Sequence, residues 1–163
     1  MTGAFLELMN KNSFGKMTVD LICKEVGLNR STFYFHFSDK YMLFEKAREF
    51  VGKELCVTEG EFSDAADALL SLVKKYPGYY MYCCSTDIGE PDTDLLCAEG
   101  LSEKEKGYLL NSYADAFKGI LKRWIESGFE DDADAIRNVL QAAGLTKEVF
   151  KDPVLAANTL ICG

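Results

Sequence analysis

The chain has 163 residues, of which 48% are hydrophobic and 27% are charged. This composition excludes a chain that is disordered throughout, because it supplies enough apolar side chains for one globular core. No apolar run reaches the roughly 18 residues that a membrane-spanning helix needs, and the first residues lack the pattern of a secretory leader. We therefore expect a cytoplasmic protein without a membrane partner.

The net charge of -8 at first argues against nucleic acid as a partner. The charge is unevenly distributed, however. Residues 1–52 hold seven Lys or Arg and six Asp or Glu, whereas residues 53–163 hold 11 and 20. Because the local field near the contact governs phosphate binding, the sequence is compatible with a DNA-binding head on an acidic body.

The cysteines and the single histidine predict no metal site and no cofactor. Six cysteines are present, and none of their spacings resembles a disulfide framework, so we expect free thiols in a reducing compartment. His36 is the only histidine, and no two cysteines have the separation of zinc ligands. One histidine also leaves little for nucleophile–base chemistry, so no catalytic residue is predicted.

Apolar residues recur every three or four positions, which predicts an all-α fold. A first helix is expected over residues 4–11 and a turn over residues 12–17. Thr18 is placed to cap a second helix, and this helix ends at Gly27, a residue that tolerates a left-handed backbone.

Asn29 is placed to cap the next helix, residues 30–37, which is rich in polar and aromatic side chains. Another helix is expected to start at Lys40. Two short helices joined by a tight, glycine-containing turn predict a helix-turn-helix. Phe33 and Phe37 are four residues apart and both face the core, so the other side chains of this helix face outward, where they can meet a major groove.

Three groups of residues stand at fixed spacings that are unlikely to occur together by chance. They are Thr18, Val19 and Ile22; residues 26–37; and Asp39, Lys40 and Leu43. Together they resemble the N-terminal signature of the TetR family of bacterial transcriptional regulators. The resemblance implies a three-helix DNA-binding head, residues 1–52, on a helical effector-binding and dimerisation body, residues 53–163. The run from Asn29 to Tyr34 is most similar to the branch that contains dihydroxyacetone-kinase activators.

The resemblance also implies which side chains lie at the DNA. The matching positions are Thr18, Asn29, Arg30, Ser31, Thr32, Tyr34, Phe35, His36 and Lys40. Lys40 is expected to hold a phosphate together with the backbone N–H groups at the start of its helix. Two departures from the family pattern are expected to lower DNA affinity: the chain begins inside the family's first helix, and Phe35 stands where a polar or basic residue is frequent.

The longest helical pattern covers residues 105–128, and an amphipathic segment follows it. The pair is similar to the last two helices of the family, which pack against their copies in a four-helix dimer interface. The implied interface residues are Leu109, Tyr113, Phe117, Ile120, Trp124, Ile136 and Leu140. A helix pair that packs within one chain explains the same apolar stripe and is the alternative.

Residues 76–84 hold four tyrosines and two cysteines. In the family the equivalent region helps to line the effector cavity, so Tyr79, Tyr80, Tyr82 and Cys83 are expected to contact a small-molecule effector of unknown identity. The alternatives are ordinary helix packing and a redox sensor built on Cys83 and Cys84. The tail, residues 145–163, receives no functional role.

These expectations describe a homodimeric regulator that binds a palindromic operator in double-stranded DNA and responds to an effector. Repression is the expected mode, with activation as the alternative. Two other functions stay open: a helical protein-interaction module that has lost DNA binding, and a small helical enzyme.

Overall fold

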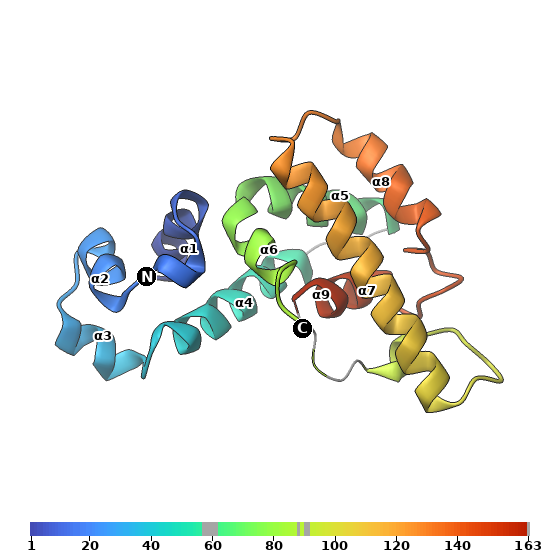
Figure 1. Ribbon diagram of the computed structural model, residues 1–163, viewed down its shortest axis with the longest axis horizontal. Coiled ribbons are helices and arrows are strands. Elements are labelled where there is room, and N and C mark those ends of the chain that lie inside the picture. The colour runs from blue at the N-terminus through green and yellow to red at the C-terminus, as the bar shows by residue number, and fades with distance from the viewer. Residues whose placement is uncertain (57–61, 88, 90–91, 163) are drawn as a thin grey trace.

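The structure is a computed structural model that describes residues 1–56, 62–87, 89 and 92–162. Within these ranges the named elements are helices, which confirms the prediction of an all-α fold (Figure 1). The elements are α1 Thr2–Lys11, the 3-10 turn η1 Phe14–Lys16, α2 Val19–Val26, α3 Arg30–His36, α4 Lys40–Cys56, α5 Phe62–Lys75, α6 Pro77–Cys83, η2 Thr93–Leu95, α7 Glu103–Glu126, α8 Ala133–Ala142 and α9 Pro153–Cys162. None of the described helices is long and apolar enough to cross a membrane.

The predicted ends of α2 are confirmed. The Thr18 hydroxyl accepts a hydrogen bond from the backbone N–H of Leu21 at 3.2 Å, as an N-cap does. Gly27 closes the helix with φ of 72°, in the left-handed region that favours glycine. This cap turns the chain sharply, so that α3 crosses α2 a few residues later.

The body is built around α7, the long helix that crosses the right half of Figure 1. It packs against α5, α6, α8 and α9. The tail, for which the sequence suggested no role, supplies α9, and the side chains of Ala156, Leu160 and Ile161 are buried there. The tail is therefore part of the core of the body.

Helix α4 belongs to both halves of the molecule, since it starts beside α3 and runs to the body (Figure 1). It packs against α1 at one end and against α5 and α9 at the other. Arg48 in its middle donates a hydrogen bond to the backbone carbonyl of Cys162 at 3.0 Å. The buried apolar side chains form one cluster that includes Phe5 in the head and Phe117 in the body.

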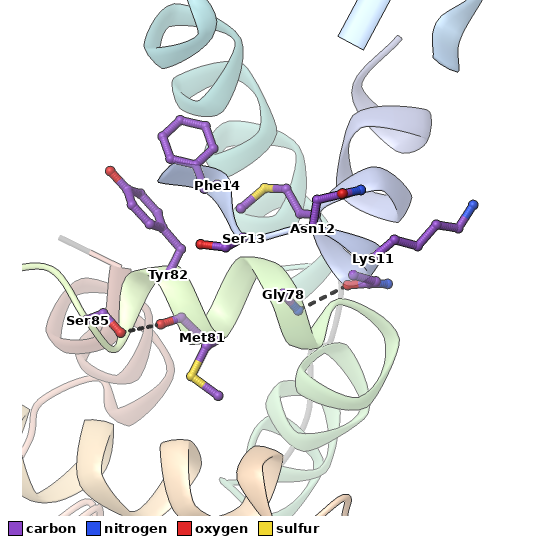
Figure 2. Close-up of a pocket in the computed structure, with 10 residues that line it drawn as sticks. Lys11, Asn12, Ser13, Phe14, Gly78, Met81, Tyr82 and Ser85 are labelled. Carbon is purple, nitrogen blue, oxygen red and sulfur yellow. Dashed lines mark hydrogen bonds between the residues drawn. The ribbon is translucent and has the colours of Figure 1, made fainter. Parts of the chain in front are cut away.

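A second junction between head and body lies where α1 meets the start of α6. The Asn10 side chain accepts a hydrogen bond from the backbone N–H of Gly78 at 3.1 Å and donates one to the Lys75 carbonyl at 3.1 Å. Figure 2 shows the bond that ends on Gly78. A Cβ atom at residue 78 would lie 1.9 Å from the Met9 carbonyl oxygen, so only glycine permits this approach of the two backbones.

Candidate nucleic-acid interface

Helix α3 starts at an asparagine cap whose side-chain oxygen accepts three hydrogen bonds. The Asn29 Oδ1 atom accepts hydrogen bonds from the Thr32 N–H at 2.8 Å, the Thr32 hydroxyl at 2.9 Å and the Ser31 hydroxyl at 2.7 Å. The predicted N-cap at Asn29 is therefore confirmed. The hydroxyls of Ser31 and Thr32 are both directed to this cap.

We expect Asn29→Ala to lower the free energy of unfolding by about 1 kcal/mol, the usual loss when an N-cap side chain is removed. The measurement is urea denaturation followed by circular dichroism. Asn29→Asp keeps an acceptor oxygen and is expected to retain most of the stability. Equal losses in the two variants would contradict a capping role for the Oδ1 atom.

The outward side of α3 carries the side chains that the sequence predicts to lie at DNA. Phe33 is fully buried and anchors the helix, while Arg30, Tyr34 and His36 are exposed. Phe35 is 83% exposed, which is the largest exposed fraction among the large hydrophobic side chains in the described part of the chain. An apolar ring held so far from the core is available for a partner surface such as a groove with thymine methyl groups.

Arg30 is held between α2 and α3. Its guanidinium lies 3.1 Å from an Asp20 carboxylate oxygen and 5.9 Å from the centre of the Tyr34 ring. A hydrogen bond with Tyr34, and next the charge of Asp20, raise the pKa of Arg30, so the group stays cationic. Since both partners are exposed, a phosphate or a guanine edge can replace Asp20 at small cost.

Lys40 has its hydrogen-bond partners inside the head. Its ammonium donates to the backbone carbonyls of Phe14 at 3.0 Å, Met17 at 2.9 Å and Gly15 at 3.4 Å. It also lies 4.7 Å from the centre of the Phe14 ring. Its donors are therefore used inside the head in this geometry, and the expectation that this ammonium holds a phosphate stays a prediction.

The family resemblance and the position at a helix start place Lys40 at DNA. Its carbonyl partners lie more than 20 residues earlier, and no sequence signal indicates them. One residue that sequence reasoning missed lies next to Lys40. Tyr41, in the first turn of α4, is 57% exposed, and its ring lies 5.5 Å from the Lys40 ammonium. A tyrosine directly after Lys40 was the available sequence signal for an exposed aromatic side chain at the start of α4.

The predicted dimer residues divide into two groups. Phe117, Trp124, Ile136 and Leu140 are buried within the single chain. Trp124, for example, donates its indole N–H to the Asp131 carbonyl at 2.9 Å. The alternative of packing within one chain describes these four side chains in the single chain, and their part in a dimer stays a prediction. Leu109, Tyr113 and Ile120 are half-buried, and their part in a dimer stays a prediction.

The predicted effector residues also divide. Tyr79, Tyr80 and Cys83 are buried in the core, where burial is the first cause that raises the pKa of each group. Ordinary helix packing describes these three side chains in the single chain, and their contact with an effector stays a prediction. Tyr82 does line a cavity, of about 310 Å³, between α1 and α6, together with Phe14, Met81 and Ser85 (Figure 2).

The surroundings of Cys83 and Cys84 do not favour a redox sensor, because burial raises the pKa of both thiols. Free thiols are present at Cys23, Cys83, Cys84, Cys97 and Cys162. Burial raises the pKa of Cys84 to about 12, which disfavours the reactive thiolate.

Comparison with known proteins agrees with this geometry. Residues 4–47 match the family model described as "Bacterial regulatory proteins, tetR family". The match covers α1 to α3 and the first part of α4, including every predicted DNA-facing residue. No curated protein matches the sequence. The head of this chain is thus similar to the N-terminal domain of the tetR family of bacterial regulatory proteins.

Proposed function

We propose that the chain is a TetR-type transcriptional regulator that acts in the cytoplasm as a homodimer. The observation that carries the proposal is the arrangement of α3: Phe33 is buried, and Arg30, Tyr34, Phe35 and His36 point outward from a capped helix. The N-terminal turns of such a helix are the part that reads base edges in the major groove. The match of residues 4–47 supports the same role.

Pairing of two chains follows from the small size of the head. One recognition helix makes too few contacts for selective binding, whereas two heads about 34 to 36 Å apart read two half-sites of a palindrome. The paired surface is proposed to be the outer side of α7 and α8, which contains half-buried Ile120 and exposed Val139. The side chains that turn inward from these helices belong to the core of each chain.

The proposed mode is repression, which binding of an effector relieves. The two junctions between head and body couple the effector site to the DNA-binding helices. A change in the position of α6 reaches α1 through Gly78 and Asn10, and α4 passes directly from one half to the other. An effector that favours a wrong separation of the two heads weakens operator binding, typically by about 1 to 3 kcal/mol. The similarity to the branch of dihydroxyacetone-kinase activators belongs to this proposal as well.

DNA binding is tested with the full chain and a duplex selected from a random pool. Arg30→Ala is expected to weaken binding about tenfold in fluorescence anisotropy, which is typical for loss of one base or phosphate contact. Affinity of the unchanged protein is expected to fall steeply with salt, because bound phosphates release counterions. The matched control is Lys104→Gln, which removes a cation from the start of α7, outside the head.

The alternatives predict other results. A protein-interaction module would select no duplex from the pool although it forms a stable dimer. An enzyme would turn over a substrate and keep that activity in the Arg30→Ala variant. A protein that stays monomeric at micromolar concentration would contradict the palindromic operator.

A further inference from the structure

A polar cavity of about 540 Å³ lies between the end of α6 and the middle of α7. One wall is a single face of α7, with residues three, four and seven positions apart. The other wall is the chain that follows α6. The lining residues used here are Asn111, Asp115, Lys118 and Lys122 on α7, and Thr86 and Asp87 after α6. Its volume is in the range of small-molecule sites.

Lys118 is the unusual member of this wall. Its side chain is only 8% exposed, and among the described residues it is the one charged side chain that is buried. Its ammonium donates a hydrogen bond to the Thr86 carbonyl, which satisfies one of three donors. Within the described residues no carboxylate lies in ion-pair range of Lys118 or Lys122. Burial of a charge without a counter-charge is unfavourable.

The two lysines stand four residues apart on α7, so their ammonium groups lie on the same face. Like charges at this spacing destabilise a helix. The positive charges of both lysines reach Cys84 on the opposite wall, where each acts to lower the pKa of the thiol. Burial of Cys84 raises this pKa by more. Neither ammonium forms a direct ion pair in the described part of the chain, so an anion between the two lysines would receive a charge-assisted contact from each.

The rest of the wall limits which anion fits. Asp87 and Asp115 also line the cavity, and their negative charge opposes a ligand with several acidic groups. The same carboxylates, with the amide of Asn111, accept hydrogen bonds from hydroxyl groups. A ligand with one acidic group and one or more hydroxyls meets both requirements.

We propose that this cavity binds a small hydroxylated organic anion, whose carboxylate or phosphate group lies between Lys118 and Lys122. The proposal rests on the proposed regulatory function where it makes this anion the effector. The position suits that role, because the cavity is at the end of α6 and the Gly78 contact with the head is at its start.

Binding is tested without DNA, by calorimetric titration of the full chain with three probes that share a three-carbon skeleton. Glycerate carries a carboxylate, glycerol phosphate carries a phosphate, and glycerol carries no charge. At least one anion is expected to bind with a Kd of about 1 mM or tighter, and glycerol is expected not to bind. The first two titrations distinguish a carboxylate ligand from a phosphate ligand.

Lys122→Gln is expected to weaken anion binding at least tenfold, while Lys104→Gln on the same helix leaves it unchanged. Because Lys122 is exposed, its variant keeps the fold; Lys118→Met is the second variant, and it retains the apolar stem. Absence of anion binding, or equal binding by Lys122→Gln, would overturn the proposal. Anion binding by a protein that selects no DNA would instead overturn the proposed function alone.

Discussion

Replacement of Gly78 by alanine is expected to lower the free energy of unfolding by about 2 to 3 kcal/mol, the upper range for an overpacked site. The added Cβ would lie 1.9 Å from the Met9 oxygen and 2.4 Å from the Met9 carbonyl carbon. These are backbone atoms of α1, so no side chain can rotate away to make room. The helices must separate, and the hydrogen bond between Asn10 and the Gly78 N–H is lost with the contact.

This result has the opposite sign to the one that helix propensity alone predicts. Gly78 lies in the first turn of α6, and alanine is normally a better helix former than glycine. Gly107 in α7 provides the matched control, because nothing lies within 4 Å of the position of its Cβ. Gly107→Ala is expected to raise the urea midpoint, and Gly78→Ala to lower it.

The same variant tests how the two halves communicate. If α1 separates from α6, the head loses this backbone contact with the body, and its orientation depends on α4 and on the contact between the Phe14 and Tyr82 rings. DNA affinity at a temperature where the variant is folded is then expected to fall, although no DNA-facing residue has changed. A variant with the stability and DNA affinity of the unchanged protein would contradict the close contact at this junction.

The head could be predicted well from sequence because its signals are local. The cap at Thr18, the left-handed Gly27 and the cap at Asn29 each act within four residues of their partners. The alternation of inward Phe33 and outward Arg30 and Tyr34 follows from helical spacing. Local signals of this kind fix both the turn and the outward face of α3.

The body was predicted less well because its partners are distant in sequence. An apolar stripe on α7 shows that the helix needs cover, but it does not show whether α9 or a second chain provides it. In the structure α9 packs on α7, and therefore Phe117 is buried without a dimer. The tyrosines of α6 have the same ambiguity, since Tyr79 and Tyr80 could fill a core or line a cavity.

Lys40→Met is expected to lower the free energy of unfolding by about 2 kcal/mol, which is within the range for hydrogen bonds to a charged group. The ammonium joins the start of α4 to three carbonyls of the turn between α1 and α2, at 2.9 to 3.4 Å. Methionine keeps the apolar stem against the Phe14 ring but leaves these carbonyls without a donor. The measurement is urea denaturation of the full chain.

Lys46→Met serves as the control on the same helix. Lys46 is exposed and pairs with Glu49 at 2.8 Å, an arrangement that contributes about 0 to 1 kcal/mol. A structural role for Lys40 requires a clearly larger loss of stability than in this control. If Lys40→Met were as stable as the control and instead reduced the salt dependence of DNA binding by one phosphate contact, the sequence-based assignment of Lys40 to the DNA backbone would be supported.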